Sequence, residues 1–325
     1  MSGFIETAPE QEADPAFRRD ILAGLTKSPK ATPPVWFYDR HGSDLFERIT
    51  RLPEYYPTRA ESAILAQRGG EIAALIGPGR CVVEFGAGSL AKTPLLLRAI
   101  DPAAYVPVDI SGDHLRESVA ALAETFAWLP LTPVEADFTR GFELPPGLAG
   151  LPRLGFFPGS TIGNFEPAAA VDLLRGMGAA LGEGAMLLIG MDRIKSPDVL
   201  IPAYDDALAV TAAFNLNLLH RINRQLDGTI PVDAFRHEAR WNDDAARVEM
   251  HLRAAAPVRF RVAGQMFAMD QDETIHTESS HKYGRRSAAL LLRAGGWEPL
   301  REWRDAGGLF SVWLAEVRRQ RSQKG

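Results

Sequence analysis

The sequence predicts an α/β fold in which a Rossmann-like, doubly wound sheet is joined to a smaller α+β domain. Two features predict it. From Arg80 onward, short apolar runs alternate with amphipathic segments, which is the pattern of repeated βαβ units. After Met191 this alternation stops, and a helical segment with two strand-like segments closes the chain. The length of 325 residues allows one large domain or two ordinary ones.

Five segments are expected to form the parallel strands of the sheet. Continuous apolar runs such as residues 185–189 suit strands that helices cover on both faces. Amphipathic segments between the runs predict the connecting helices. The expected strands are Cys81–Glu84, Tyr105–Val108, Thr132–Ala136, Arg153–Phe157 and Ala185–Gly190, and the expected helices lie near Thr93–Ile100, Asp113–Phe126 and Pro167–Leu181.

The flanking segments complete the prediction. Residues 1–34 begin loosely and end in a proline-rich stretch that cannot continue a helix. Apolar residues at helical spacing predict one long helix over Pro202–Leu226, followed by an inserted β-rich module. Further helices are expected at Ser43–Thr50, Ala60–Ile76 and Tyr283–Ala294, and further strands at Phe235–Trp241, Arg247–Arg253, Val258–Val262, Trp297–Arg304 and Phe310–Val317, the last two forming a hairpin.

This order of elements resembles the class I S-adenosylmethionine (SAM) methyltransferase sheet, whose last strand runs antiparallel in a C-terminal hairpin. The resemblance implies a division of the chain into four parts. Residues 61–195 would form the SAM-binding domain, and residues 285–325 would complete its sheet with a helix and a hairpin. Residues 196–284 would form an inserted substrate-binding domain, to which the N-terminal segment 1–60 contributes.

Composition and charge argue against several classes of protein. Thirty-six Lys and Arg residues against 41 Asp and Glu give a net charge of −5, which disfavours nucleic-acid binding through bulk charge. The single cysteine, Cys81, can form neither an internal disulfide nor a thiolate metal site. Residues 1–20 lack a signal-peptide pattern, and no apolar stretch is long enough to span a membrane. We expect a cytoplasmic monomer with no nucleic-acid or membrane partner.

The first βα turn carries a candidate nucleoside site. Gly86 and Gly88 follow a buried strand, and such glycines let the backbone approach a ligand closely, although a tight turn without a ligand has the same pattern. Asp109 ends the second strand, where a carboxylate can accept both ribose hydroxyls of NAD or of SAM. Lys92 favours SAM, because an ammonium at a helix start suits the carboxylate of a methionine moiety.

The ends of the third and fourth strands carry further candidates. Asp137 offers an acceptor for an adenine amine and Phe138 a ring to stack on, although a surface acid beside a core phenylalanine fits equally well. In the loop 158–165, Asn164 could bind the ammonium and carboxylate groups of an amino acid. A helix N-cap is another role that suits this asparagine, and both roles could hold at once.

Four motifs together resemble the histidine Nα-methyltransferases of ergothioneine biosynthesis. They occur in the family's order, and the resemblance runs from about Arg19 to the C-terminal hairpin. The long tyrosine motif at residues 52–59 is the most specific of the four. The motifs are Tyr38-Asp39-x-x-Gly42-Ser43-x-Leu45-Phe46, Leu52-Pro53-Glu54-Tyr55-Tyr56-Pro57-Thr58-Arg59, Gly159-Ser160-Thr161-Ile162-Gly163-Asn164 and Thr277-Glu278-x-Ser280.

The resemblance implies SAM-dependent trimethylation of the α-amino group of L-histidine to give hercynine, the first step towards ergothioneine. SAM would be the methyl donor and no metal would take part. Within the tyrosine motif, the choice between Tyr55 and Tyr56 as the ligand stays open. By matching motifs, SAM would be bound by Gly86, Lys92, Asp109, Asp137 and Phe138, and histidine by Tyr55, Gly159, Thr161, Asn164, Tyr204, Met250, Glu278 and Ser280, with Tyr38 and Asn164 as the catalytic pair.

The chemistry fits these residue types. Methyl transfer from a sulfonium needs a neutral amine in line with the methyl carbon, so positioning should supply most of the rate. Asn164 would hold the amine, and Tyr38 would steer the proton that leaves. Glu278 could accept from the imidazole N–H while a hydroxyl of Ser280 or the tyrosine completes the other ring edge.

Three alternatives remain at this point. The nearest is a class I methyltransferase acting on another amino acid or small amine. An NAD(P)-dependent oxidoreductase and a catalytically silent sensor of amino acids or nucleosides are the others. His276 and His281 flank Glu278, but their five-residue spacing does not place both on one helix face, which disfavours a metal site there.

Overall fold

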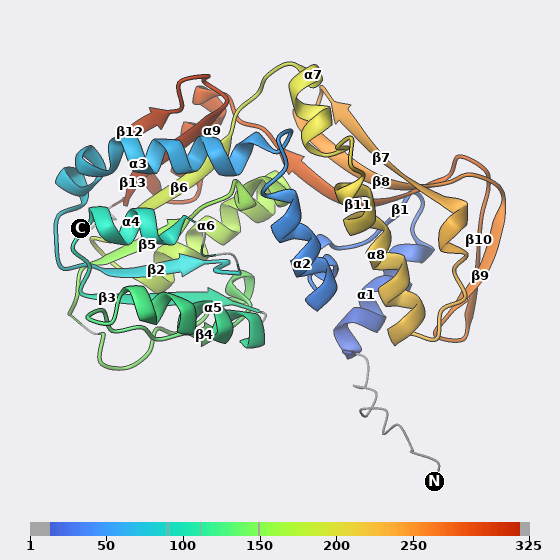
Figure 1. The fold of residues 1–325 in the computed structure, drawn as a ribbon, viewed down its shortest axis with the longest axis horizontal. Coiled ribbons are helices and arrows are strands. Elements are labelled where there is room, and N and C mark those ends of the chain that lie inside the picture. Colours follow the sequence, from blue (N-terminus) through green and yellow to red (C-terminus); the bar gives the residue numbers. More distant parts are fainter. Residues whose placement is uncertain (1–13, 89, 91, 111, 149, 319–325) are drawn as a thin grey trace, which may run out of the picture. The chain divides into compact units, whose positions relative to one another are not determined.

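The computed structural model describes residues 14–88, 90, 92–110, 112–148 and 150–318 (Figure 1). The chain divides into two compact units, which are described separately. Unit 1 comprises Met1–Gly42, Ala212–Glu238 and Met250–Glu278. Unit 2 comprises Ser43–Thr211, Ala239–Glu249 and Ser279–Gly325.

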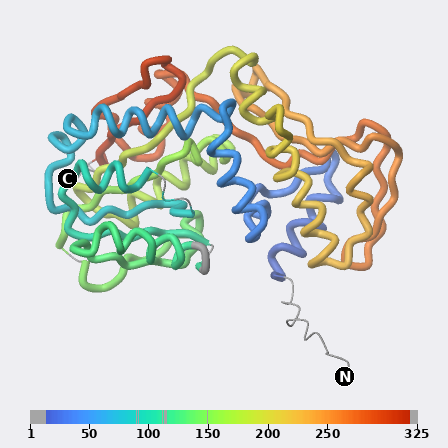
Figure 2. Tube along the Cα trace, in the orientation of Figure 1, coloured from blue at the N-terminus to red at the C-terminus, as the bar shows by residue number. Residues whose placement is uncertain are grey.

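Unit 2 contains a seven-stranded sheet in the order β12-β13-β6-β5-β2-β3-β4. Strands β2 to β6 pair in parallel, whereas β13 runs antiparallel to both of its neighbours. In Figure 2 the red C-terminal segment lies in the same unit as the cyan and green strands. This topology confirms the predicted class I sheet. Its strands are β2 Cys81–Phe85, β3 Ala104–Asp109, β4 Val134–Glu135, β5 Arg153–Phe157, β6 Met186–Asp192, β12 Trp297–Arg304 and β13 Phe310–Val317.

Helices cover both faces of this sheet. Alternate residues of its strands point to opposite faces, and because both sets are apolar, each face needs a layer of helices to bury it. Val83 and Phe85 of β2 belong to the core cluster that includes Leu174 of α6. Val82, between them, belongs to the opposite cluster with Ile72 of α3. The helices with most of their residues in unit 2 are α2 Arg40–Ile49, α3 Tyr56–Ile76, α4 Thr93–Ala99, α5 Gly112–Thr125, α6 Pro167–Leu181, α7 Pro197–Leu200 and α9 Arg285–Ala294, and short 3₁₀ helices are η2 Phe138–Arg140, η3 Thr161–Asn164 and η4 Ile201–Ala203.

Unit 1 carries the remaining elements. A mixed sheet has the order β1-β11-β8-β7, and β9 pairs with β10 in an antiparallel hairpin. Strands β7, β8 and β11 each cross the boundary between the units along the chain. The elements are α1 Pro15–Thr26, β1 Lys30–Ala31, η1 Pro34–Phe37, α8 Val210–Gln225, η5 Val232–Ala234, β7 Phe235–Asn242, β8 Arg247–Ala254, β9 Val258–Val262, β10 Gln265–Met269 and β11 Thr274–His281.

The prediction of one long helix over residues 202–226 is wrong. Ala209 has a φ of 55°, which a helix cannot contain, and α8 starts only at Val210. The carboxylate of Asp206 accepts the backbone N–H groups of Val210 and Thr211 at 3.0 and 2.7 Å, so it caps the new helix. The sequence prediction also missed α1, α7, β1, β10 and β11.

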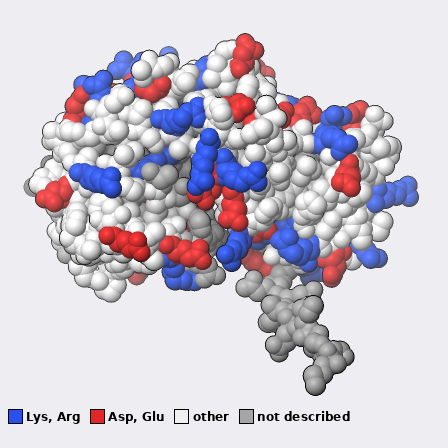
Figure 3. Space-filling view, viewed as in Figure 1, with Lys and Arg blue, Asp and Glu red and all other residues white. Residues whose placement is uncertain are grey.

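Charge distribution and helix hydropathy describe the surface of the protein. On the face shown in Figure 3, basic and acidic side chains are interspersed. Among the described residues, no helix is both long and apolar enough to cross a membrane.

Candidate active site

The loops that follow the parallel strands of unit 2 hold most of the predicted site residues. The carboxyl ends of parallel strands meet at one edge of a sheet, and ligands of open α/β sheets bind there. Gly86 follows β2, Asp109 ends β3, Asp137 follows β4, Gly159 follows β5 and Asp192 ends β6. The topology therefore brings the predicted SAM residues and the loop 158–165 to the same edge.

The first βα turn lies close to the next two strand ends. Gly86 has a φ of 75°, and its N–H donates to the carbonyl of Val108 at 2.9 Å. A Cβ placed on Gly86 would lie 3.6 Å from the ring of Phe138, and one on Gly88 would lie 3.4 Å from Oδ2 of Asp109. Glycine thus leaves room on the two sides where a nucleoside would lie. Residues 89 and 91 of this loop lie outside the described residues.

Asp137 and Phe138 also have structural roles. Oδ1 of Asp137 accepts the N–H of Thr139 at 3.0 Å and caps η2. The ring of Phe138 packs edge-on against those of Phe85 and Phe157, with centroids 6.2 and 5.9 Å apart. The half-buried ring therefore extends the aromatic core to the edge of the sheet, where it can still offer a face.

Lys92 is anchored by a carboxylate that the sequence analysis did not single out. Its Nζ lies 2.6 Å from Oε2 of Glu61, which is fully buried. The same oxygen accepts the N–H of Gly159 at 2.8 Å. Because an ammonium group has three donors, this contact leaves Lys92 able to bind a further acceptor.

The loop 158–165 is fixed at several points. The hydroxyl of Ser160, whose φ is 58°, accepts the N–H of Asp192 at 2.8 Å. Further along, Nδ1 of His281 donates to the carbonyl of Gly163 at 2.9 Å, and a Cβ on Gly163 would lie 2.7 Å from the His281 carbonyl oxygen. This contact places Asn164, the next residue, beside the end of β11, where Ser280 lies.

Asn164 is the last residue of η3, and its side chain is half-buried. The N-cap position of α6 is occupied by Glu166 instead, so the alternative role of Asn164 as a helix cap is wrong. Thr161, at the start of η3, donates its hydroxyl to the carbonyl of Pro158 at 3.0 Å. The asparagine amide therefore has no capping role that would compete with ligand binding.

Tyr204 and Ser280 meet at a buried lysine. The Tyr204 hydroxyl donates to Oγ of Ser280 at 2.8 Å, and Nζ of Lys282 donates to both oxygens at 2.7 Å. The ring of Tyr55 stands edge-on to that of Tyr204, with centroids 6.5 Å apart. Three residues predicted to bind histidine are therefore contiguous in unit 2.

Tyr55 and Tyr56 have different surroundings. The Tyr56 hydroxyl donates to Oδ2 of Asp192 at 2.8 Å and accepts from Nζ of Lys195 at 2.6 Å. Burial and the charge of Asp192 raise the pKa of Tyr56 far above its ordinary value. Tyr55 is half-buried and lies against Tyr204. The hydroxyl of Tyr56 is therefore committed to Asp192 and Lys195, and the choice of Tyr55 as the ligand stays a prediction.

Asp192 is buried between two lysines. Its carboxylate lies 2.6 Å from Nζ of Lys195 and 2.9 Å from Nζ of Lys282. Burial alone would raise the pKa of Asp192, but the charges of Lys282 and Lys195 outweigh it and hold that pKa below its ordinary value. Burial lowers the pKa of Lys195 to about 8 against the opposing effect of Asp192.

Unit 1 carries the other three predicted residues. Tyr38 directly follows η1, and its ring packs edge-on against Phe214 with centroids 5.8 Å apart. The side chain of Met250 is buried, and its carbonyl accepts the hydroxyl of Thr277 at 3.0 Å. Glu278 follows Thr277 on β11 and is 9% exposed.

The two histidines that flank Glu278 each contact a backbone carbonyl. In unit 1, Nε2 of His276 lies 2.9 Å from the carbonyl oxygen of Glu278. In unit 2, Nδ1 of His281 lies 2.9 Å from the carbonyl oxygen of Gly163. Since a carbonyl only accepts, each of these ring nitrogens carries a proton.

Four buried ionisable residues of unit 2 were not among the predicted site residues. Glu61, Asp192 and Lys282 are each at most 3% exposed. Glu84 is another, and its Oε2 accepts the hydroxyls of Thr93 and Tyr105, both at 2.7 Å. Burial raises the pKa of Glu84 to about 7. Only Glu84 and Asp192 had a local signal, an acid within or at the end of an apolar strand.

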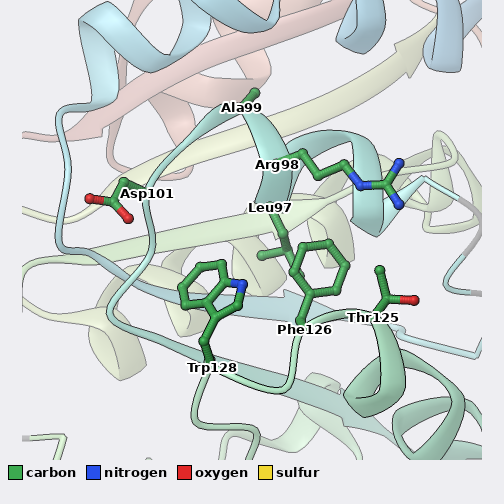
Figure 4. A pocket seen from close by; sticks show the side chains of 7 residues that line it. All are labelled: Leu97, Arg98, Ala99, Asp101, Thr125, Phe126 and Trp128. Atoms are coloured by element: carbon green, nitrogen blue, oxygen red, sulfur yellow. The ribbon is translucent and has the colours of Figure 1, made fainter.

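Two surface hollows of unit 2 lie away from these residues. The one in Figure 4, about 410 Å³, is bounded by Leu97 and Arg98 of α4 and by the rings of Phe126 and Trp128. These residues precede β3 and β4, so the hollow lies at the amino ends of the strands, opposite the candidate site. The other is lined by residues of α9, β12 and β13. Neither contains a predicted site residue.

Comparisons with known proteins identify the family of this chain. A sequence model of the family described as "Histidine-specific methyltransferase, SAM-dependent" matches residues 17–317. The chain is 42% identical to a histidine N-alpha-methyltransferase of Mycolicibacterium smegmatis, over 92% of this chain and 94% of that protein. It is 41% identical to one of Mycobacterium tuberculosis, with the same coverage. A crystal structure of a SAM-dependent methyltransferase from Clostridium acetobutylicum aligns with a TM-score of 0.49 and 12% identity, over 85% of this chain and 98% of that one.

Proposed function

This chain belongs to the family of histidine-specific, SAM-dependent methyltransferases, and from that premise we propose that it methylates the α-amino group of L-histidine three times to give hercynine. The similarity to two histidine N-alpha-methyltransferases, over 92% of this chain, supports this substrate. Hercynine would be the first intermediate on a route to ergothioneine, and a protein that is 30% identical carries the name of ergothioneine biosynthesis protein 1.

The observation that carries the proposal is the position of the loop 158–165. One end of the loop contacts Glu61, which also binds Lys92, a predicted SAM residue. The other end contacts His281, the neighbour of the predicted histidine ligand Ser280. A loop held between donor and acceptor residues in this way is suited to placing the amine nitrogen in line with the methyl carbon.

We assign SAM to the strand ends of unit 2. Asp109 would accept the two ribose hydroxyls, and Asp137 the exocyclic amine of adenine. Phe138 would stack on the adenine face, and the backbone at Gly86 would approach the nucleoside closely. Lys92 would bind the carboxylate of the methionine moiety through a donor that Glu61 does not use.

We assign histidine to two groups of residues. In unit 2, Asn164 would hold the amine and the carboxylate, while Tyr55 and Ser280 would bind the imidazole. Tyr204, whose hydroxyl proton goes to Ser280, would contact histidine through its ring rather than bind the carboxylate. Gly159 and Thr161 would shape the loop around the amine. In unit 1, Glu278 would accept a hydrogen bond from the imidazole N–H. Met250 and Tyr38 are assigned to the histidine pocket from the family resemblance.

The chemistry needs positioning more than a strong base. A free α-amino group has a pKa of about 7.7–8.0, so a neutral fraction exists near neutral pH. Asn164 would orient the amine lone pair, and Tyr38 would steer the proton released before each later transfer. Tyrosine faces would also attract the growing trimethylammonium group.

The remaining assignments follow from this chemistry. A sulfonium methyl group is already electrophilic, so we propose a reaction without a metal ion. Both substrates are small metabolites, and we propose a monomer that works on them in the cytoplasm without nucleic-acid or membrane partners. The net charge of −5 is consistent with this proposal.

A substrate panel tests the proposed function. The full-length protein is incubated with SAM and, separately, with L-histidine, L-tryptophan, L-tyrosine or histamine, and products are identified by mass spectrometry. We expect methylated products from L-histidine alone. Methylation of another amino acid in preference to histidine would overturn the assigned substrate. Calorimetric titration with SAM and with NAD provides the control for the cofactor, and binding of NAD in place of SAM would overturn that assignment.

A further inference from the structure

Lys282 is a fully buried ammonium group with three acceptors around it. Its Nζ lies 2.9 Å from Oδ2 of Asp192 and 2.7 Å from both the Tyr204 hydroxyl and Oγ of Ser280. The side chain is 0% exposed. An ammonium group has three protons to donate and no lone pair, so these contacts use all its hydrogen-bonding capacity.

The carboxylate beneath Lys282 is equally saturated. Oδ1 of Asp192 accepts from Nζ of Lys195 and from the N–H of Arg193, at 2.6 and 2.9 Å. Oδ2 accepts from the Tyr56 hydroxyl and from Lys282, at 2.8 and 2.9 Å. Four donors, Lys282 among them, occupy the lone pairs of the carboxylate. It therefore has no free lone pair for a second N–H of Lys282, whose other two protons stay directed at the hydroxyls of Tyr204 and Ser280.

The direction of the Ser280 hydrogen bond follows from this arrangement. Lys282 can only donate, so the oxygens of Tyr204 and Ser280 both accept from it. The Tyr204 hydroxyl donates its own proton to Ser280. Oγ of Ser280 thus accepts twice, and its proton is left to donate to a third atom.

The charge of the cluster favours the same kind of ligand. Asp192 supplies one negative charge, while Lys195 and Lys282 supply two positive charges within 3 Å of it. A ligand atom that accepts a hydrogen bond from Ser280 is therefore favoured. A cationic ligand close to Lys282 is disfavoured, because the cluster already carries an excess positive charge. A neutral ring nitrogen with a lone pair satisfies both conditions, whereas an imidazolium ring satisfies neither.

We propose that Lys282 is a positioning residue that fixes Ser280 as a hydrogen-bond donor and so makes the site select the neutral imidazole of its substrate through the ring's acceptor nitrogen. The inference rests on the proposed function. It adds that discrimination at this edge of the ring depends on a lysine that need not touch the substrate.

The test compares L-histidine with a pyrrolylalanine that keeps one ring N–H but has C–H in place of the acceptor nitrogen. Both are assayed with the full-length protein, and the ratio of their kcat/KM values measures the discrimination. In Lys282→Met, we expect this ratio to fall roughly tenfold to a hundredfold, as for a lost hydrogen bond in a buried site. The affinity for SAM should stay within about twofold of that of the wild-type protein.

Lys195→Met is the matched control. Each substitution removes one lysine and leaves Asp192 paired with the other, so both variants keep a balanced buried pair and lose a similar contact with the carboxylate. The two lysines differ in their other contacts: Lys282 donates to Ser280 and Tyr204, whereas Lys195 donates to Tyr56. We therefore expect Lys195→Met to keep the wild-type ratio, and an equal loss in the two variants would reduce Lys282 to a structural role.

Two further results decide the inference. In Ser280→Ala the ratio should fall as in Lys282→Met, and the double variant should fall no further, because both changes remove the same donor. An unchanged ratio in Lys282→Met would overturn the inference while leaving the proposed function intact. Should Lys282→Met fail to fold, Lys282→Arg keeps the charge but not the three-way contact and should show the same fall. Failure of the wild-type protein to methylate histidine would instead overturn the proposed function.

Discussion

The ammonium group of Lys92 lies 2.6 Å from Oε2 of Glu61, and that same oxygen accepts the N–H of Gly159. One buried carboxylate therefore joins the start of α4, where SAM is expected to bind, to the loop that would hold the amino acid. Glu61 comes from the second turn of α3, which packs against the sheet core. Glu61 thus links the two predicted binding regions through its contacts with Lys92 and Gly159.

The first prediction concerns this pair. Lys92→Met removes the countercharge of a fully buried carboxylate and a proposed SAM ligand together. We expect the affinity for SAM to fall at least about tenfold and the free energy of unfolding to fall by about 3 kcal/mol or more. Calorimetry and denaturant unfolding measure the two effects. Lys27→Met, at an exposed site in unit 1, is the control. Unchanged SAM binding in Lys92→Met would remove Lys92 from the site.

The second prediction separates the two adjacent tyrosines. Tyr56→Phe deletes a hydroxyl held between Asp192 and Lys195, so it should lower the free energy of unfolding by about 1–3 kcal/mol. Tyr55→Phe should instead raise the KM for histidine and lower the free energy of unfolding less than Tyr56→Phe does, because Tyr55 is less buried than Tyr56. Steady-state kinetics and thermal unfolding of both variants test this. The reverse pattern would make Tyr56 the ligand.

The third prediction concerns Glu278. Replacing it by Gln keeps the size of the side chain but weakens the acceptor proposed for the imidazole N–H. We expect the KM for histidine to rise roughly tenfold to a hundredfold, while the dissociation constant for SAM changes little. Glu183→Gln, at an exposed position of unit 2, is a control of the same chemical change. Equal losses for both substrates in Glu278→Gln would argue for a general structural role.

The fourth prediction concerns the buried carboxyl of Glu84. Burial raises its pKa from 4.5 to about 7, so between these values the folded protein keeps a proton that the unfolded chain has lost. Glu84 therefore makes stability fall as the pH rises from about 4.5 to 7, by about 3 kcal/mol in total. Glu84→Gln, which cannot ionise, should lack this contribution.

Unfolding curves of Glu84→Gln and the wild-type protein, measured from pH 5 to 8, test the sign. We expect the stability of the variant relative to the wild-type protein to increase with pH. Glu117→Gln, at an exposed position of α5, should run parallel to the wild-type protein. A difference between Glu84→Gln and the wild-type protein that does not change with pH would contradict the buried, protonated carboxyl.

The sheet of unit 2 was predictable because its strands are short, apolar and separated by helical patterns. Arg153–Phe157 and the two hairpin strands have the predicted bounds, and the remaining parallel strands differ by no more than about two residues at each end. The antiparallel last strand followed from the order of elements. Hydrophobic periodicity depends on local sequence, so these strands can be predicted without knowledge of tertiary contacts.

The failures in secondary structure have local physical causes. The segment 202–226 kept helical spacing across a break at Ala209, and the capping role of Asp206 was overlooked. Strand β11 escaped prediction because its residues are mostly polar, although six of its eight residues are buried. In that strand Thr277 and Ser280 are hydrogen-bonded to buried partners, which sequence patterning does not reveal.

The candidate site was predicted residue by residue, but not its support. Motifs drew attention to Lys92, Tyr204 and Ser280. The partners that orient them, Glu61 and Lys282, lie 31 and 78 positions from Lys92 and Tyr204. The pairs Glu61–Lys92 and Lys282–Tyr204 meet only in the folded chain, so sequence spacing did not indicate them.

The tandem mass spectrum of the product formed from L-histidine and isotopically labelled SAM tests the central claim most directly. We predict a product that carries three labelled methyl groups, all on the α nitrogen, with an unmodified imidazole ring. A labelled methyl group on the ring, or no labelled product from histidine, would contradict the assigned reaction.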